Sequence, residues 1–529
     1  MGQITLLEFA TDNRLTILLI KERAKCRRRN RDAKKPHILD RECDIDELSA
    51  RKMLSRLMPP RRQWVVPSKR VKLPNGAVDT SKNAEKALLL TITRDRKLRE
   101  KGASFPYLDE MDAFFARIRK RLSSDDLQLE KPRLMPILKD TKEIGGGVLL
   151  VTCRPLCAYS CLEDKIILSL TSRYLTHVVD RYLHNDLLSY RPPRYFRGEN
   201  HHRVDFNDGI ELIKDFRNEH NDSDIYAADC DIKKFYDIIP HQVVRDCFWR
   251  LLNRTDLDEE GKGQVMKVVE AYLKSYSFYN DAWLKAQQDD SVYAKVRRRL
   301  HDHDKRNMYQ LGWADEIKGK TEEELLHLGV PQGGALSLLV ANIVLNDVDR
   351  VFTENEDPNR LFMRFCDDMI LLHTDYEECC RLMECYAESL REHGLYYHDF
   401  RCVADCSRRE FWGIKSHRPF LWGEGEDNSN SYIGFLGYEL RRDGKMRLRK
   451  SNIERFKEKF DRQRYALRRY SKKHTPEETE QHQKKVLDNI LNGVAFYTAF
   501  NQSAFKRSRQ FKYLEKLRDR LKKGNISES

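Results

Sequence analysis

Two adjacent carboxylates, Asp367 and Asp368, interrupt an otherwise apolar stretch of the chain. Apolar residues from Leu361 to Met363 precede them and the run from Met369 to Leu372 follows, so the pair lies where a tight β-hairpin turn is expected. Two negative charges in low dielectric repel each other and lose hydration, and they therefore need a positive partner. A divalent metal meets that need, since Mg²⁺ is commonly held by one or two carboxylates plus substrate phosphates. The alternative is an ordinary surface turn, where Asp-Asp pairs are frequent.

A second carboxylate pair occurs in the short predicted strand that begins at Tyr226. Side chains alternate along a strand, so Asp229 and Asp231 share one face while Cys230 and Ile232 share the other. Asp231 is the better candidate for a metal ligand, because the strand runs out there into a turn that contains two lysines. A second site of this kind favours the metal interpretation of Asp367 and Asp368 over the surface turn.

A glycine-rich segment, Gly329 to Ser337, forms the third element and precedes a helical run from Leu338 to Val348. Paired glycines allow the backbone to approach a ligand closely, and the start of a helix offers unpaired N–H groups. We expect this segment to line a site for a nucleotide or nucleic acid.

These three segments together resemble the sequence motifs of the reverse transcriptases, in particular the bacterial enzymes related to group II intron, retron and phage-defence proteins. Motif A corresponds to Asp231–Asp237, motif B to Gly329–Ser337 with its continuation through Ile343, and motif C to Phe365–Asp368, in the order of the family. Motif C in the family commonly reads Tyr-Ala-Asp-Asp, so its first two residues differ here. Motif B usually has proline after the serine, where this chain has Leu338.

Weaker resemblances extend from about residue 130 to about residue 510. Upstream of the motifs, residues 154–156 and 164–167 resemble segments of the fingers, and residues 189–192 resemble the end of the next helix. Downstream, residues 435–438 resemble the primer-grip hairpin, and residues 490–493 with Tyr497 resemble part of the thumb. The resemblance implies an α+β right-hand polymerase with fingers, palm and thumb, in which helices back the palm sheet. The expected domains are a basic, mainly helical N-terminal extension (1–125), fingers (126–222), a palm (223–440) with a helical insertion at 241–328 on its outer side, and a thumb of basic helices with a short tail (441–529).

The resemblance also implies a catalytic centre with two Mg²⁺ ions, for which Mn²⁺ is an alternative. Asp231 and Asp367 are expected to bridge both ions, and Asp368 to support the ion that activates the primer hydroxyl. The main-chain carbonyl of Ile232 is the expected ligand on the triphosphate side.

Tyr236 occupies the position that the family places beneath the 2′ carbon of the sugar. An aromatic ring there excludes a ribose 2′-hydroxyl by a clash, which predicts DNA synthesis; a core aromatic is the alternative. The other expected nucleotide contacts are Phe235, Arg154, Lys142, Gln332, Gly333 and Gly334. Lys415 corresponds to a basic residue near the leaving pyrophosphate, although an ordinary surface lysine is the alternative.

The charge distribution agrees with a nucleic-acid enzyme. The chain has 97 lysines and arginines against 83 acidic residues, a net charge of +14. Residues 441–470 carry 13 basic and 4 acidic residues and residues 21–35 carry 9 and 2, so both segments are candidates for phosphate binding. The expected nucleic-acid contacts are Arg447, Arg449, Lys450, Arg462 and Arg464; a solvated helix face is the alternative for any one of them.

The composition argues against a membrane protein and a secreted protein. No stretch reaches the ~18 consecutive apolar residues of a membrane span, the N-terminus lacks the layout of a signal peptide, and 13 cysteines without framework spacing favour a reducing, cytoplasmic location.

The expected function is an RNA-directed DNA polymerase with an RNA template, dNTP substrates and a DNA product, acting in anti-phage defence with a non-coding RNA partner. A group II intron-like maturase and a non-catalytic RNA-binding scaffold are the alternatives. No membrane partner is expected, and homo-oligomerisation stays open.

Overall fold

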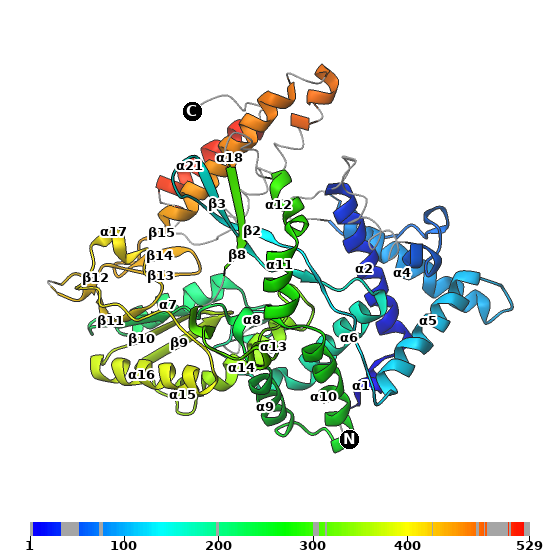
Figure 1. Cartoon of the computed structure of the whole chain (residues 1–529), viewed down its shortest axis with the longest axis horizontal. Coiled ribbons are helices and arrows are strands. Elements are labelled where there is room, and N and C mark those ends of the chain that lie inside the picture. Colours follow the sequence, from blue (N-terminus) through cyan, green and yellow to red (C-terminus); the bar gives the residue numbers. More distant parts are fainter. Residues whose placement is uncertain are drawn as a thin grey trace. The chain divides into compact units, whose positions relative to one another are not determined.

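A computed structural model of the chain describes residues 4–32, 52–72, 78–196, 200–299, 306–312, 315–425, 427–471, 475–480, 482–483, 506 and 509–522 (Figure 1). The chain divides into two compact units. The first unit comprises residues 1–183, 234–347 and 393–395, and the second comprises 184–233, 348–392 and 396–529.

Helices dominate the N-terminal part of the first unit. They are α1 (Leu6–Phe9), α2 (Asp12–Asp32), the 3₁₀ turn η1 (Arg61–Gln63), α4 (Thr80–Arg99), α5 (Pro106–Ser123), α6 (Leu162–Val179) and η2 (Asp180–Tyr182). In α5 the buried residues recur three or four positions apart, from Leu108 through Met111 and Phe115 to Leu122, which gives one apolar face. Helix α2 packs against both α4 and α6, so these helices share one core.

The first unit also contains a three-stranded sheet in the order β2 (Ile137–Glu143), β3 (Val148–Arg154), β8 (Arg306–Leu311). Strands β2 and β3 form an antiparallel hairpin around three glycines with positive φ, Gly145 to Gly147. A separate two-stranded pair joins β1 (Arg133–Leu134) to β4 (Cys157–Ala158). Under this sheet lies a cluster of buried residues that includes Val151, Phe278 and Leu311.

The segment 241–328 was expected to be a wholly helical insertion on the outer side of the palm, and this expectation is wrong for β8. That strand pairs in parallel with β3, so part of the insertion completes the sheet of the fingers region. The local sequence Arg306–Leu311 is too short for its alternation to reveal a partner about 150 positions away. The rest of the segment is helical: α9 (His241–Leu252), α10 (Glu259–Lys274), the π-helical η3 (Phe278–Leu284), α11 (Lys285–Gln288), η4 (Asp290–Tyr293), α12 (Ala294–Arg299), η5 (Asp315–Ile317) and α13 (Glu322–Leu326).

Two further helices of the first unit carry motif residues. Helix α8 (Phe235–Ile238) belongs to motif A, and α14 (Ser337–Val348) follows motif B directly. The Ser337 hydroxyl donates a hydrogen bond to the carbonyl of Pro331, which closes the glycine-rich segment onto the start of α14. The helix therefore begins one residue earlier than the sequence predicted, and leucine at position 338 is accommodated.

The second unit is built on a five-stranded sheet. Its order is β12 (Ser429–Asn430), β11 (His417–Trp422), β7 (Tyr226–Cys230), β10 (Asp368–His373), β9 (Arg360–Phe365), and β10 is antiparallel to both of its neighbours. Helix α16 (Tyr376–Glu392) packs against β7, β10 and β11, while α7 (Phe206–Glu219) packs against β9. Shorter elements of this unit are β5 (Arg194–Phe196), β6 (Asn200–His202), α15 (Arg350–Thr353) and α17 (Arg408–Phe411).

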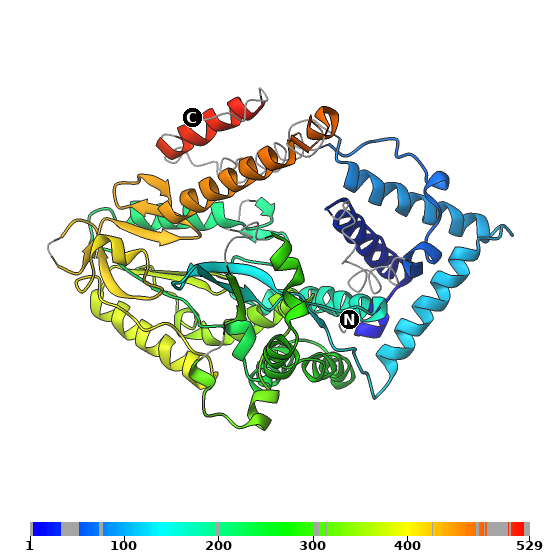
Figure 2. The same cartoon turned by 45° about the horizontal axis from the view of Figure 1, so that its top comes forward.

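A second, three-stranded antiparallel sheet follows in the same unit: β13 (Tyr432–Phe435), β14 (Tyr438–Arg441) and β15 (Met446–Leu448). Leu436 and Gly437, both with positive φ, form the turn of the hairpin expected at 435–438. Helices α18 (Lys450–Ser471) and α21 (Arg509–Lys522) lie side by side in Figures 1 and 2, and the Lys457 ammonium lies 5.5 Å from the centre of the Tyr513 ring.

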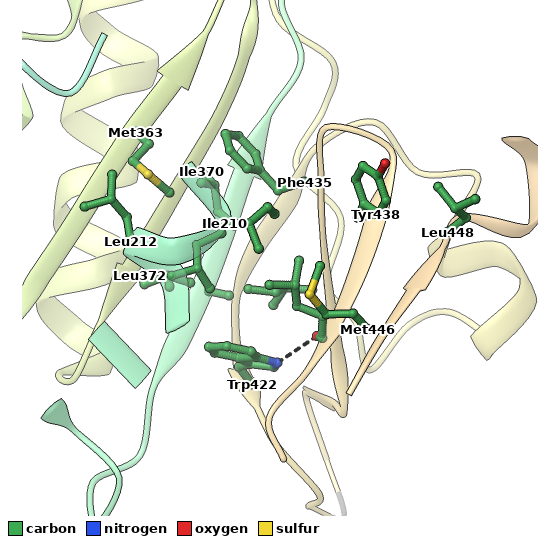
Figure 3. Close-up of a cluster of buried hydrophobic side chains, with 14 of the residues drawn as sticks. Ile210, Leu212, Met363, Ile370, Leu372, Trp422, Phe435, Tyr438, Met446 and Leu448 are labelled. Carbon is green, nitrogen blue, oxygen red and sulfur yellow. Dashed lines mark hydrogen bonds between the residues drawn. The ribbon is translucent and has the colours of Figure 1, made fainter. Parts of the chain in front are cut away.

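The core of the second unit lies between the two sheets and α7 (Figure 3). Ile370, Leu372 and Met363 contribute from the large sheet, and Phe435 and Met446 contribute from the small one. Figure 3 also shows the indole N–H of Trp422 donating to the carbonyl of Leu440 at 3.2 Å, which links the two sheets by a buried hydrogen bond.

The boundaries of these units differ from the expected domains. Residues 184–222 were assigned to the fingers but group with the second unit, and 234–347 were assigned to the palm but group with the first. The segment 189–192 was expected to end a helix; instead it is irregular, with bends at Ser189 and Tyr190, and Leu187 just before it forms a parallel bridge with Arg364. Strand β15 extends the small sheet beyond residue 440, into the region expected to be thumb. The thumb residues 490–493 and Tyr497 lie outside the described residues.

Among the helices that the structure describes, none combines the length and the apolar character needed to cross a membrane.

Candidate catalytic carboxylate site

Strand register brings two of the predicted carboxylates together. Cys230 on β7 pairs with Met369 on β10, so the next residues outward, Asp231 and Asp368, face each other across the sheet. Both side chains lie on the face that also carries the core residue Ile370, because side chains alternate along a strand. The sequence predicted that Asp231 would meet the Asp367-Asp368 turn, and the structure places it there.

Hydrogen bonds from buried polar groups fix the turn that holds Asp367. Cys366 has a φ of 61° and begins the turn between β9 and β10. Its N–H donates to Ser189 Oγ at 2.9 Å, and its carbonyl accepts from Arg364 Nη1 at 2.9 Å. Arg364 is itself fully buried and donates through Nε to Asp349 Oδ2 at 2.6 Å. A buried, hydrogen-bonded ion pair therefore orients the main chain that presents Asp367.

Burial and the charges around Asp368 change the pKa of its carboxyl group. Loss of hydration, followed by repulsion from Asp367 and Asp231, raises the pKa of Asp368 to about 6, while Arg449 and Lys415 act in the opposite direction. The Asp368 side chain keeps contact with solvent at the mouth of a small cavity of about 100 Å³, which Asp231 and Arg449 also line. Lys415 Nζ lies 2.7 Å from Asp231 Oδ2. The site thus already draws positive charge to itself.

A neighbouring carboxylate in the same cavity, Asp229, has a different role. His417 Nδ1 lies 2.9 Å from both of its oxygens, and the His417 N–H donates to Oδ1 at 3.0 Å. His417 is buried, and its Nε2 is paired with the carbonyl of Phe411. Because both oxygens of Asp229 are engaged inside the protein, it is a support for β7 and β11 rather than a metal ligand.

The three remaining carboxylates fit a hard divalent cation. Asp231, Asp367 and Asp368 supply carboxylate oxygens, the ligands that Mg²⁺ prefers, and the charges of Asp367 and Asp231 act on Asp368 in a way that a bound cation would relieve. The adjoining main chain is held in place, since the carbonyl of Asp231 accepts from the His398 N–H at 3.0 Å and Ile232 forms a bridge with Tyr397.

In the first unit, motif B is joined to the helix of motif A. Gln332 Nε2 donates to Asp237 Oδ1 at 2.7 Å, and the Gln332 carbonyl accepts from the Cys157 N–H at 2.9 Å. Asp237 is buried, and loss of hydration raises its pKa to about 6 in spite of the nearby Lys234 ammonium. The Val330 N–H donates to the carbonyl of Tyr236 at 2.8 Å. These contacts fix the side-chain amide of Gln332.

Gly329 shows why motif B needs glycine. Its φ is +88°, and a Cβ at this position would lie 2.7 Å from the carbonyl oxygen of Asp237. Both the conformation and the space exclude a side chain. Gly333 also has a positive φ, of +87°, while a Cβ on Gly334 would lie 2.9 Å from Ser337 Oγ. The glycines of this segment therefore serve its close packing.

The other predicted nucleotide contacts of the first unit differ in exposure. Tyr236 is half-buried, and its ring stands edge-on to Phe235 at 5.2 Å. Phe235 is buried, so its side chain supports Tyr236 rather than facing a ligand. Arg154, at the end of β3, and Lys142, on β2, are both exposed. The carboxylates belong to the second unit and these residues to the first.

The basic residues expected to bind nucleic acid differ in their partners and in their exposure. Arg449 lines the carboxylate cavity, with its guanidinium 5.5 Å from the Trp412 ring. Arg447 pairs with the buried Glu439 and stacks on Tyr432 at 4.1 Å, so it has internal partners that the sequence did not predict. Lys450 is exposed at the start of α18. The side chains of Arg462 and Arg464 lie outside the described residues.

Sequence reasoning missed two residues of the site. His417 was not singled out, and for Lys415 the sequence predicted a pyrophosphate contact or a surface position but no pairing with Asp231; both contact carboxylates at the end of β7. Each lies more than 180 positions from its partner, so no local spacing could have indicated the contact.

A comparison with protein-family models matches residues 281–440 to the family described as reverse transcriptase (RNA-dependent DNA polymerase). The match contains motifs B and C and begins after motif A, so the place of Asp231 rests on the strand register. Residues 281–440 are therefore similar to a reverse transcriptase domain. A search of curated proteins finds no match.

Solved telomerase structures show a distant likeness. One is telomerase from Candida tropicalis in complex with a fragment of telomeric RNA, with 15% identity and a TM-score of 0.31. The match covers 74% of this chain, and this chain spans 57% of the length of that protein. Another is the corresponding complex from Candida albicans, with 13% identity, a TM-score of 0.32, and 91% and 78% coverage. The apo enzyme from Candida tropicalis gives 13% identity, a TM-score of 0.35, and 91% and 82% coverage.

The site predicts selective binding of a divalent metal. Replacing Asp231 or Asp367 with asparagine removes a charged ligand, so the affinity for Mn²⁺, measured by electron paramagnetic resonance, should fall at least tenfold. Asp229→Asn is the matched control on the same strand, and it should keep the wild-type affinity because His417 already holds Asp229. Equal loss in all three variants would contradict this assignment of ligands.

Proposed function

We propose that this protein extends a primer with deoxynucleotides on an RNA template, using Asp231, Asp367 and Asp368 as the catalytic carboxylates. The observation that carries the proposal is the facing of Asp231 and Asp368 across β7 and β10, next to the turn that bears Asp367. The reverse transcriptase domain over residues 281–440 supplies the reaction class.

The carboxylates would hold the metal ions. Asp231, Asp367 and Asp368, with the carbonyl of Ile232, would hold the two Mg²⁺ or Mn²⁺ ions. When bound, these ions stabilise the attacking and leaving oxygens of nucleotidyl transfer. Lys415 and Arg449 lie beside the carboxylates and provide positive charge for the phosphates of the incoming nucleotide. Lys415 would exchange its contact with Asp231 for a phosphate oxygen when the site is loaded.

Residues of the first unit would select the nucleotide. Tyr236, supported by Phe235, would exclude a ribose 2′-hydroxyl, and Gln332, held by Asp237, would line the pocket for the new base pair together with Gly333 and Gly334. Exposed Arg154 and Lys142 would contact the triphosphate.

We further propose that the protein acts in anti-phage defence with a dedicated non-coding RNA. The support is the resemblance of its motifs to bacterial enzymes of that kind and the region of about 125 residues before the fingers, which a minimal polymerase does not need. Exposed basic residues of that region, including Arg61, Arg62, Lys69 and Arg70, suit an RNA backbone.

The RNA bound in cells tests this role. Sequencing of RNA and cDNA that co-purify with the protein should recover one abundant RNA and its DNA copy. An intron RNA would instead identify a maturase. RNA without any DNA copy would identify a scaffold and would contradict the polymerase proposal.

Primer extension tests the chemistry. Purified protein with an annealed RNA template, a DNA primer, dNTPs and Mg²⁺ should extend the primer, and Asp367→Asn should reduce the rate at least a thousandfold with an unchanged circular dichroism spectrum. Asp256→Asn, which alters an exposed ion pair with Arg181, is the control and should retain activity. Extension by Asp367→Asn at the wild-type rate would refute the assignment.

Sugar selection tests Tyr236. Tyr236→Ala removes the proposed steric block, so the ratio of kcat/KM for dNTP over the matching rNTP should fall by about tenfold or more, which is about 1.4 kcal/mol of discrimination. Tyr236→Phe keeps the ring and should keep the ratio. Unchanged rejection of ribonucleotides by Tyr236→Ala would show that another residue selects the sugar.

A further inference from the structure

Tyr190 is an exposed aromatic residue in an unfavourable backbone conformation. Its φ is +56°, in the left-handed region that non-glycine residues rarely adopt, and its relative exposure is 57%. The residues on either side of it, Ser189 and Arg191, are buried. A bulky residue in this conformation persists only where the surrounding structure imposes it, and such residues concentrate at functional sites.

The surrounding structure does impose it. The Arg364 N–H donates to the carbonyl of Asp186 at 3.1 Å, and the Leu188 N–H donates to the carbonyl of Arg364 at 3.0 Å, so the segment runs along the outer edge of β9. Beyond Tyr190, Arg191 Nη1 donates to the carbonyl of His184 at 2.6 Å. The main chain is thus anchored before and after Tyr190, and the side chain between the anchors is turned outward.

The Tyr190 ring lies beside the turn of motif C. Its centre is 6.4 Å from that of Phe365, with the rings tilted by 48°. Phe365 is the cross-strand partner of Asp368. Partial burial, the Cys366 thiol and the charge of Asp367 together raise the pKa of Tyr190, which agrees with a ring close to the catalytic turn. Ser189 also accepts the hydrogen bond from Cys366, so one short segment supports the turn and presents the aromatic ring next to it.

We propose that Tyr190 is a stacking surface for the 3′-terminal nucleoside of the primer strand. The inference rests on the proposed function and extends it, because it assigns a residue outside motifs A, B and C to the strand being extended. The reacting 3′-oxygen must lie at the carboxylates, so the nucleoside that carries it lies within reach of a ring next to Asp367. Every base has a π face, so stacking on tyrosine holds a primer end of any sequence.

The choice of tyrosine at a strained position follows from this role. Glycine would relieve the backbone but would give no surface to stack on. An aromatic ring offers a flat face on which a base can stack.

Three variants of Tyr190 distinguish the effect of losing the aromatic ring from the effect of relieving the backbone strain. Tyr190→Phe should match wild type. Tyr190→Ala should raise the Kd for a primer–template duplex, measured without nucleotides by fluorescence anisotropy, about five- to tenfold, and should leave the KM for dNTP unchanged. Tyr190→Gly should weaken primer binding equally while keeping or raising the melting temperature, because glycine accepts the positive φ. Tyr376→Ala, at another exposed tyrosine of the same unit, is the control and should bind as wild type.

The outcomes are distinct. Wild-type primer affinity in Tyr190→Ala and Tyr190→Gly would overturn the proposal, and so would a defect in the alanine variant that glycine restores, since that would implicate the backbone alone. An equal loss of affinity for single-stranded template without primer would overturn the assignment to the primer. Because binding is measured without catalysis, an inactive wild-type protein would refute the proposed function while the Tyr190 comparison would still be decided.

Discussion

Mutual repulsion among three carboxylates is the constraint around which the second unit is organised. Asp231 and Asp368 face each other across two strands, and Asp367 lies one residue away in the turn. Such an arrangement is unfavourable in the absence of cations: burial first, and then the charges of Asp367 and Asp231, raise the pKa of Asp368. Two cationic side chains of the protein, Lys415 and Arg449, line the same cavity and partly compensate this negative charge. A site that attracts positive charge in this way is prepared for metal ions and for the phosphates they accompany.

Rigid support is the second requirement, because ligands that repel each other would otherwise move apart. The face of the sheet that carries the carboxylates continues directly into the core shown in Figure 3, where Ile370 and Met363 pack against Phe435 of the small sheet. Beneath the turn, the buried pair of Arg364 and Asp349 holds the carbonyl of Cys366. Buried ion pairs are costly to desolvate, so this one is better explained by the geometry it enforces than by stability.

The sequence was informative where a short pattern determines the structure. The apolar runs around Asp367 and Asp368 specified a hairpin, and alternation along β7 placed Asp229 and Asp231 on one face. Glycines at 329, 333 and 334 indicated a segment of unusual backbone, and two of them do have positive φ. These features depend on residues within a few positions of each other, which is the range over which periodicity and turn chemistry act.

The rest depends on contacts between distant segments, for which one sequence carries no signal. The parallel pairing of β8 with β3, the bridge between Leu187 and Arg364, and the engagement of Asp229 by His417 each join residues more than 150 positions apart. Local composition also gave no indication that the guanidinium of Arg447 pairs with buried Glu439.

The most direct test of the central claim is the position of the metal itself. A crystal structure of the protein with primer–template, Mn²⁺ and a non-hydrolysable dNTP, with data collected at the manganese absorption edge, locates the ions independently of any assay of activity. Anomalous peaks are expected within bonding distance of the carboxylates of Asp231, Asp367 and Asp368. Peaks elsewhere, with Asp231 still paired to Lys415, would contradict the claim.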